Sequence, residues 1–468
     1  MNQPLGTAQT ETAGGHEFAT AAKSAAGYLD EGTNSHGAEK IQMVLDALTR
    51  TQTDTPHLVE IGPGGGAALQ HLTDRLTRSD RPKAVNVTLI EAPGVVSQAL
   101  AHAIDAYKAA RLGTCTLTFG LAQDLGTILD RPVDIVAASA LMHEVYSYGS
   151  GYQGIHEFMQ TLPTVLKPGG HFAYRDVLTV DSATLHETVT QTYTHRGWLH
   201  FIRKFVPQYL RDGRHPYHRS SDDPIVRQNS RIVPLEEIDP RVSAVITGPV
   251  GLFREIQRHY LTFRKDVWRA GALGFRPEME GRFSADWIDA AAGHRRVHFT
   301  LTEAEWLSPS LLKAVSEPFE DHFAVDGDIF DECTDAAIIE LLTAAEKGDK
   351  GSMVVWQDWI AREGHETYGY LTVNELLTEF AISSAESPTD TVMMPRTTSS
   401  VVTPERAHYT RYLRNRLPNP LPDGKQVVLF TNIPARDRKA VAAGISTLRP
   451  LCSRAAMARL HSALTQMM

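Results

Sequence analysis

The sequence contains few cysteines, no long apolar run and no excess of basic residues. Three cysteines, Cys115, Cys333 and Cys452, occur among 468 residues, and they form no Cys-x-x-Cys pair. This scarcity argues against a disulfide framework and a cysteine zinc site, and it favours a reducing, cytoplasmic compartment. No stretch approaches the roughly 18 consecutive apolar residues that a membrane-spanning helix needs. The net charge of −9 and the pI near 6.1 argue against indiscriminate nucleic-acid binding, but they are compatible with a local basic surface.

Short apolar runs alternate with segments of helical periodicity over the first 180 residues. The predicted strands are residues 56–61, 85–91, 114–119, 133–138 and 171–177. Parallel strands need crossover connections, and those crossovers cover both faces of the sheet, so this alternation predicts a doubly wound, parallel α/β sheet. A sheet of this kind binds ligands at the carboxyl ends of its strands.

The alternation stops near residue 180 and resumes near the end of the chain, which predicts one interrupted domain. We expect a mobile tail over residues 1–22, a core over 23–180, a mainly helical insertion over 181–355, and completion of the sheet with a C-terminal helix over 356–468. The apolar run from Lys425 to Thr431 predicts one more buried strand. The segment from Ser383 to Thr403 is rich in Ser, Thr and Pro and predicts an exposed loop or connector. Trp356 and Trp359 are expected to be packing anchors where the chain returns to the sheet.

The strongest motif lies where the first predicted strand ends. Glu60 is followed by Gly62, Gly64 and Gly66. Glycines let the backbone approach a ligand closely, and the N-terminus of the following helix offers free N–H donors. Glu91 ends the second predicted strand, where a carboxylate can accept hydrogen bonds from the vicinal hydroxyls of a ribose. Together these residues indicate a nucleoside site.

With these residues the chain resembles the class I S-adenosylmethionine-dependent methyltransferases, whose first motif is an acid followed by G-x-G-x-G. The resemblance also covers Gln123 and Asp124 after the third strand and the Lys167 to Gly170 turn before the fifth, and it spans Ile41 to Val177. It implies a seven-stranded, mostly parallel Rossmann-like methyltransferase sheet. It also implies that the methionine part of the cofactor lies near the glycine loop, the ribose at Glu91 and the adenine near Asp124. Ser139, at the end of the fourth strand, completes the expected cofactor-binding set.

Two other interpretations of the glycine loop compete with a methyl-donor site. The same residues fit the G-x-G-x-x-A pattern of dinucleotide-binding loops, which would indicate an oxidoreductase that uses NAD. Glu60 argues against it, because a carboxylate repels a pyrophosphate but suits the cationic sulfonium and ammonium of the methyl donor. The remaining interpretation is an α/β turn that binds nothing.

Candidate catalytic residues follow the fourth and fifth strands. His143 is the best candidate for a general base, because an imidazole titrates in the useful range, but a helix cap or a loop hydrogen bond accounts for it equally well. Glu144 could shape the pocket or simply pack. Arg175 and Asp176 are expected to face the same cleft, where an ion pair that holds the loop is favoured over catalysis.

The insertion carries a stripe of cationic and aromatic side chains. Its members are Arg196, Arg203, Lys204, Arg211, Arg214, Arg219, Arg227 and Arg231, with Trp198, Phe201, Phe205, Tyr209 and Tyr217. Guanidinium groups beside aromatic rings suit an anionic acceptor such as RNA. The favoured alternative is an amphipathic helix whose rings enter the core. The histidines 195, 200, 215 and 218 show no recognised ligand spacing, so no metal site is expected.

The sequence therefore predicts a transferase that moves a methyl group from S-adenosyl-L-methionine to an O or N nucleophile and releases S-adenosyl-L-homocysteine. The acceptor is a small molecule or RNA, with a slight preference for an anionic one, and no membrane partner is expected. The alternative is a module of the same fold that binds RNA or a partner protein without catalysis.

Overall fold

A computed structural model describes residues 37–79, 83–178, 185–212, 215–216, 223–278, 296–304, 309–401, 404–422 and 424–467. The tail predicted over residues 1–22 lies outside them. The chain divides into two compact units. Unit 1 takes the described residues of 1–182, 370–401 and 424–468, and unit 2 takes those of 183–369 and 402–423. The chain therefore leaves unit 1 twice.

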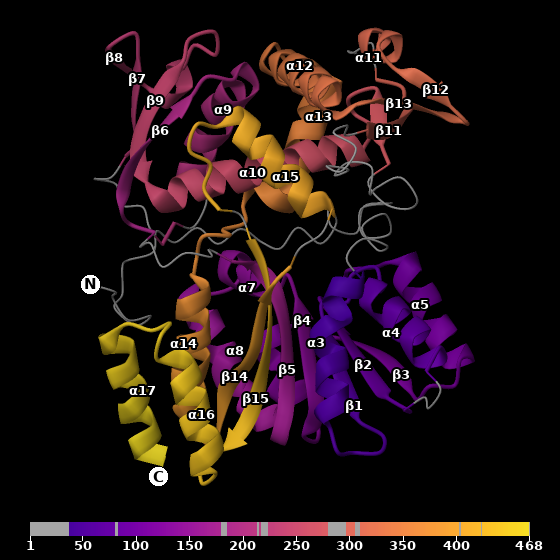
Figure 1. The fold of residues 1–468 in the computed structure, drawn as a ribbon, viewed down its shortest axis with the longest axis vertical. Helices are drawn as coiled ribbons and strands as arrows, with labels where there is room; N and C mark the ends of the chain where they lie inside the picture. The colour runs from indigo at the N-terminus through magenta and orange to yellow at the C-terminus, as the bar shows by residue number, and fades with distance from the viewer. Residues whose placement is uncertain are drawn as a thin grey trace. The chain divides into compact units, whose positions relative to one another are not determined.

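Unit 1 is built on a seven-stranded sheet in the order β14-β15-β5-β4-β1-β2-β3 (Figure 1). The strands are β1 (His57–Ile61), β2 (Asn86–Glu91), β3 (Cys115–Phe119), β4 (Val133–Ser139), β5 (Leu166–Leu178), β14 (Thr391–Ser400) and β15 (Gly424–Pro434). β1 to β5 are parallel to their neighbours, whereas β15 lies antiparallel between β5 and β14. The predicted α/β class and mostly parallel seven-stranded sheet are confirmed.

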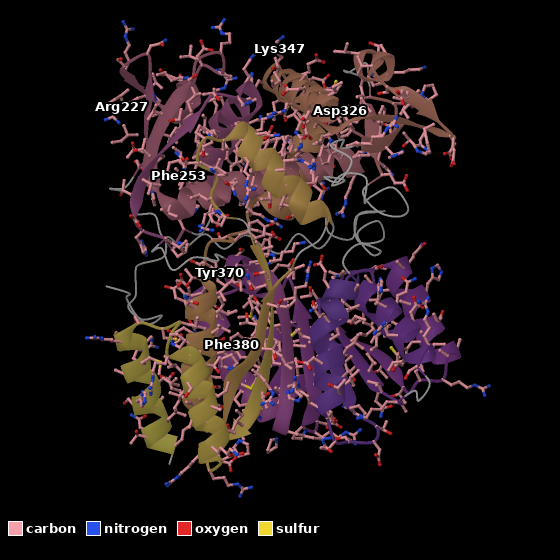
Figure 2. The ribbon with its side chains drawn as sticks, viewed as in Figure 1. Arg227, Phe253, Asp326, Lys347, Tyr370 and Phe380 are labelled. Atoms are coloured by element: carbon pink, nitrogen blue, oxygen red, sulfur yellow. The ribbon has the colours of Figure 1, made fainter. Side chains whose placement is uncertain are left out.

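Helices cover both faces of this sheet because successive side chains of a buried strand point to opposite sides. One face packs α3 (Gly37–Arg50), α4 (Ala67–Thr77) and α5 (Gln98–Ala109) on a core that includes Leu58 and Ile135. The other face packs α8 (Tyr152–Val165), α14 (Val373–Ala385), α16 (Arg438–Leu448) and α17 (Arg454–Met467) on a core that includes Val59 and Val136. Figure 2 labels Phe380 of α14, whose ring centroid lies 4.5 Å from that of Phe430 on β15. Short helices η1 (Ala122–Asp124), α6 (Leu125–Ile128) and α7 (Met142–Tyr148) follow β3 and β4.

Two local predictions in unit 1 are wrong. The segment from Ser383 to Thr403 is not an exposed loop in its described part: Ser383 and Ser384 are fully buried in α14, and β14 pairs along its length with β15. The Ser and Thr content suggested a loop, but hydroxyl groups can be buried where they form local hydrogen bonds. Ser384 Oγ, for example, accepts from Met393 N at 2.8 Å. The Lys167 to Gly170 turn does not precede β5 but interrupts it, where the pairing with β4 shifts from Val133–Leu166 to Ile135–His171.

Unit 2 combines helices with two antiparallel four-stranded sheets, which the sequence patterns did not reveal. One sheet has the order β6-β9-β7-β8 and the other β10-β11-β13-β12. The strands are β6 (Thr188–Tyr193), β7 (Ile225–Gln228), β8 (Arg231–Val233), β9 (Ala244–Pro249), β10 (Phe275–Pro277), β11 (Arg296–Leu301), β12 (Glu317–Phe319) and β13 (His322–Asp326). The helices are α9 (Arg196–Asp212), η3 (Leu235–Glu237), α10 (Val250–Arg269), α11 (Ser310–Ala314), α12 (Gly327–Glu346), α13 (Lys350–Trp359), η5 (Ile360–Gly364) and α15 (Pro404–Arg416).

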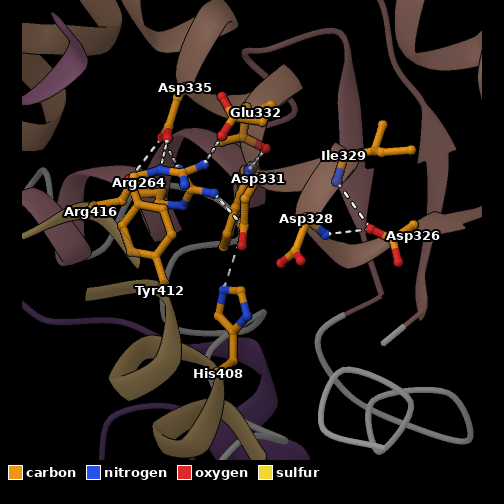
Figure 3. Close-up of polar contacts among 12 residues, drawn as sticks. Arg264, Asp326, Asp328, Ile329, Asp331, Glu332, Asp335, His408, Tyr412 and Arg416 are labelled. Carbon is orange, nitrogen blue, oxygen red and sulfur yellow. Dashed lines mark hydrogen bonds and ion pairs between the residues drawn. The ribbon is translucent and has the colours of Figure 1, made fainter. Parts of the chain in front are cut away.

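A buried polar network joins three helices of unit 2 (Figure 3). Arg264 of α10 is fully buried and donates to Asp335 and, at 2.7 Å, to Asp331, both on α12. From α15, Tyr412 Oη and Arg416 Nε each donate to Asp335 at 2.7 Å. The network therefore holds the second segment of unit 2, residues 402–423, against its first segment, residues 183–369.

No helix among the described residues is long and apolar enough to cross a membrane.

Candidate functional site

The glycine loop connects β1 to α4, and three of its residues have left-handed backbone conformations. Gly62, Gly64 and Gly66 have φ angles of 66°, 56° and 83°. A Cβ on Gly66 would lie 2.9 Å from the Cβ of Ala103, so the loop also packs too tightly against α5 for a side chain. Glycine is required at these positions on conformational grounds, and the loop presents bare backbone at the carboxyl end of β1.

Glu91 is tied to this loop. One carboxylate oxygen, Oε2, accepts from Gly64 N at 3.0 Å, and the other, Oε1, accepts from Ala92 N at 2.8 Å. The side chain is buried at the end of β2. Each carboxylate oxygen has two lone pairs, so a carboxylate oriented in this way can accept from more than one donor.

Glu60 lies at the tip of β1, where it lines a cavity together with Lys40 of α3 and Ser139 of β4. Burial raises the pKa of the Glu60 carboxyl to about 7, against the opposing effect of the Lys40 charge, and Glu91 raises it further. Burial, followed by the charge of Arg175, lowers the pKa of Lys40. The site therefore holds a carboxyl group whose ionisation is poised near neutral pH.

Arg175 holds the first turn of α3 against the sheet. Its Nε and Nη2 donate to Glu39 Oε2 at 2.9 and 2.7 Å, and its Nη1 donates to Ser139 Oγ at 2.9 Å. The arginine is 5% exposed. Its described contacts are those of a side chain that positions α3 and the end of β4.

His143, the second residue of α7, forms a buried pair with Asp176 of β5. The distance from Nδ1 to Oδ1 is 2.8 Å, and the side chains are 6% and 0% exposed. Asp176 also accepts from Tyr174 Oη at 2.8 Å and from two backbone N–H groups, those of Met142 and Val177. Burial alone would raise the pKa of Asp176, but the charge and hydrogen bond of His143 and the other donors outweigh it, so that the pKa lies below its usual value. An ionised carboxylate can only accept, so His143 donates a proton from Nδ1 to Asp176 in this pair.

The expectation that Arg175 and Asp176 face the same cleft is wrong. They are neighbours on a strand and therefore point to opposite faces. Arg175 pairs with Glu39 on the α3 face, whereas Asp176 pairs with His143 on the other. An ion pair does hold the structure here, but its acid is Glu39.

The other predicted site residues lie near the same edge of the sheet. Gln123 and Asp124 form the η1 turn after β3, where Asp124 is exposed and its Oδ2 accepts from Leu121 N at 3.4 Å. Glu144 follows His143 on α7 and is partly buried. The structure thus places Glu60 and Ser139 in the lining of one cavity. Glu91 is hydrogen-bonded to Gly64 of the glycine loop, and His143 is paired with Asp176.

The rings of the cationic stripe in unit 2 belong to its core. Trp198, Phe201, Phe205 and Tyr209 of α9 are at most 1% exposed, which matches the amphipathic-helix interpretation and leaves them unable to stack on bases. Arg203 Nη2 pairs with Glu346 at 2.5 Å, and Lys204 lies over the Trp356 ring at 5.1 Å. Trp356 and Trp359 are packing anchors, as predicted, but in unit 2. Arg227 is exposed and points outward from β7 (Figure 2).

Three members of the stripe and one histidine fall outside the described residues, namely Arg214, Arg219, Tyr217 and His218.

No protein family matches the sequence, and no curated protein does. Solved structures that the fold resembles include an S-adenosylmethionine-dependent methyltransferase from Clostridium acetobutylicum, with 8% identity, a TM-score of 0.31, and coverage of 84% of this chain and 91% of that one. An O-methyltransferase family protein from Burkholderia thailandensis has 12% identity and a TM-score of 0.26, over 47% of this chain and 59% of that one. The CcbJ methyltransferase from Streptomyces caelestis has 19% identity and a TM-score of 0.23, over 38% and 62%. The matched region thus spans less than two thirds of the latter two proteins.

Sequence reasoning missed Lys40, Glu39 and the pairing of Asp176 with His143. Lys40 could have been found, because it lies at i−4 from Val44 and i−8 from Leu48, on the apolar stripe of α3, where a charge is unexpected. The pairing across 33 residues had no local signal.

Proposed function

We propose that the chain transfers a methyl group from S-adenosyl-L-methionine to an O or N nucleophile of an acceptor. The observation that carries the proposal is the left-handed glycine loop held between two buried carboxyl groups, Glu60 and Glu91. Bare backbone at a strand tip suits a nucleoside, and two acids suit a cationic one.

The residues present fit this donor better than a dinucleotide. A pyrophosphate at the N-terminus of α4 would lie beside both acids, and like charges repel. The strand order also differs, because dinucleotide-binding sheets follow the order 3-2-1-4-5-6, whereas here the last strand inserts antiparallel between the fifth and sixth. Glu91 would hold the ribose hydroxyls, and Glu60 would face the positively charged part of the donor.

When bound, the donor supplies a methyl group on a cationic sulfur, which an acceptor can attack in line. The protein's part is alignment, and the removal of a proton where the acceptor is an alcohol or amine. His143 would take that proton on Nε2, because Asp176 holds Nδ1 protonated and fixes the ring. Asp176 and Tyr174 are positioning residues in this scheme.

Donor binding is tested by calorimetric titration of the full chain with S-adenosylmethionine, S-adenosylhomocysteine and NAD. The proposal requires binding of the first two and none of the third. Binding of NAD alone would overturn it. Incubation of cell extract and a deuterated-methyl donor with and without the chain then distinguishes catalysis from a silent binding module, because only catalysis adds a labelled acceptor that is absent from the extract alone.

The first prediction concerns the ribose. Glu91→Ala removes the carboxylate proposed to face the nucleoside and the acceptor for Gly64 N. We therefore expect the dissociation constant for S-adenosylhomocysteine to rise roughly 10- to 100-fold, the size of one charge-assisted hydrogen bond. Asp105→Ala, at an exposed position of α5, is the matched control and should leave the affinity unchanged. An unchanged affinity in Glu91→Ala, measured by the same titration, would contradict the assigned site.

A further inference from the structure

Two nearly buried histidines of unit 2 face each other across neighbouring strands. His298 lies on β11 and His322 begins β13, and these strands pair antiparallel with Phe299 opposite Phe323 (Figure 1). The distance between His298 Nδ1 and His322 Nε2 is 2.9 Å, and the two residues are 3% and 8% exposed. The centroid of the Phe319 ring lies 5.2 Å from that of each imidazole. Strand pairing and packing thus hold two imidazole nitrogens at one point.

The arrangement of protons at this contact follows in part from Asp321. Its Oδ1 lies 3.0 Å from His322 Nδ1, and the hydrogen bond from His322 lowers the pKa of the Asp321 carboxyl. An ionised carboxylate can only accept, so His322 donates from Nδ1. Two nitrogens 2.9 Å apart need one donor and one acceptor, so at least one lone pair is directed into the contact between the rings.

This arrangement is similar to that of histidines that bind metal ions. A ligating imidazole commonly donates its second N–H to a carboxylate, which orients the ring and raises its basicity. His322 has such a partner in Asp321, while its Nε2 is directed at His298. Zinc–nitrogen bonds of about 2.0–2.1 Å at a tetrahedral angle place two nitrogens about 3.3 Å apart. The contact of 2.9 Å therefore has to widen by only about 0.4 Å to admit the ion, which a small rotation of the rings provides.

We propose that His298 Nδ1 and His322 Nε2 bind a divalent transition-metal ion of the class that imidazole prefers, with Zn²⁺ as the reference ion, and that Asp321 orients His322. On binding, the proton between the rings moves to solvent or to the other nitrogen of its ring. The ion joins β11 to β13, so it is a structural element of unit 2 and takes no part in methyl transfer. Two protein nitrogens leave two positions of a tetrahedral zinc to water or another ligand. We therefore expect a dissociation constant of roughly 1 to 100 µM, weaker than that of a four-ligand structural site.

The test is a calorimetric titration of the full chain with ZnCl2, after treatment of the protein with a chelator. The proteins compared are the wild type, His298→Gln, His322→Gln and the control His186→Gln, which removes an exposed histidine of the same unit. Glutamine retains a polar side chain but places no imidazole nitrogen at the contact. A fifth protein, Asp321→Asn, keeps both imidazoles and removes only the orienting charge, from a side chain that is 96% exposed.

We expect the wild type and His186→Gln to bind one more zinc ion per chain in this concentration range than His298→Gln or His322→Gln. Loss of one of two ligands should weaken zinc binding at the pair at least about tenfold. Asp321→Asn should keep the stoichiometry and weaken the affinity roughly tenfold, because a neutral amide is a poorer acceptor and orients His322 less firmly. Saturating zinc should also raise the unfolding temperature of the wild type, but of neither variant at the pair.

Several results would overturn the metal site. Equal stoichiometry and affinity in the wild type, His298→Gln and His322→Gln would show that the rings only share a proton. Loss of the zinc ion in His186→Gln alone would place it elsewhere. If neither variant at the pair folds, as judged by near-ultraviolet circular dichroism, an unchanged zinc affinity in Asp321→Asn contradicts the pair. S-adenosylhomocysteine should bind the wild type equally well with and without zinc, so failure of this site leaves the methyl-donor site untouched.

Discussion

The Glu60 carboxyl is a single group whose ionisation changes near neutral pH, because burial raises its pKa to about 7 in the free protein. A ligand ammonium beside it favours the ionised form and lowers that pKa on binding. The protein must therefore release a proton to bind below pH 7 but not well above it. We expect the affinity for S-adenosylhomocysteine to increase about fivefold as the pH rises from 6 to 7, and by about tenfold in all by pH 8, where it levels off.

Calorimetric titrations at several pH values measure this dependence of the affinity on pH. In Glu60→Gln the side chain cannot ionise, so the affinity should be weaker above pH 7 and nearly independent of pH across the same range. A wild-type affinity that is constant from pH 6 to 8, or that falls as the pH rises, would contradict the placement of the ligand ammonium beside Glu60.

Residues whose role depends on local sequence were predictable, and those whose role depends on long-range pairing were not. The spacing of Gly62, Gly64 and Gly66 was enough to indicate a tight loop, and all three have positive φ angles. Whether Glu60 binds a cation stays a prediction. The alternation of Arg175 and Asp176 between faces follows from strand geometry, but their partners Glu39 and His143 come from distant elements and carry no sequence signal.

At the scale of elements, Asp335 connects three helices of unit 2 through its carboxylate. It accepts from Arg264, Tyr412 and Arg416, which lie on α10 and α15, and is itself on α12 (Figure 3). Asp335→Ala would leave two buried or nearly buried guanidinium groups without this partner. We expect it to lower the free energy of unfolding of unit 2 by about 3 to 5 kcal/mol, measured by urea denaturation.

The matched control is Glu332→Ala on the same helix. Glu332 Oε1 lies 2.8 Å from Arg416 Nη2, but the glutamate side chain is 66% exposed, so this ion pair is screened by solvent. We expect a loss below about 1 kcal/mol. Equal losses in the two variants would mean that the buried network does not hold the three helices together.

Elements with an apolar period were visible in the sequence, whereas β14 and α15 were not. The last part of β14 has exposed or partly exposed Thr and Ser side chains along an edge strand, so it lacks the alternation that marks a half-buried strand. α15 is rich in arginine, and its buried contacts are largely polar, through Tyr412 and Arg416. Hydrophobic periodicity cannot reveal a helix that is held by a polar network.

At the scale of the whole molecule, each unit has cores of its own. Tyr260 and Trp198 belong to the core of unit 2, while Phe172 and Leu58 belong to the two cores of unit 1. Units with separate cores unfold as separate cooperative transitions. We therefore expect two transitions in differential scanning calorimetry, one of which is lowered by Asp335→Ala and the other by Asp176→Asn, each by roughly 5 to 15 °C. Asp176→Asn acts on unit 1 because it places an amide among four donors.

A single transition that both substitutions lower equally would show that the two units unfold as one.

The position of β15 has a consequence for the order in which the chain can be made and folded. Among the described strands it is the last to be synthesised, yet it lies between β5 and β14. Until residues 424–434 have been made, β14 therefore lacks its neighbour in the sheet, and β5 is paired with β4 alone. More than two hundred residues separate the end of β5 from that point, which is on the order of tens of seconds of translation. Throughout that interval the nascent sheet ends in an open apolar edge, and a chaperone or the growing chain itself must keep that edge from pairing with another molecule.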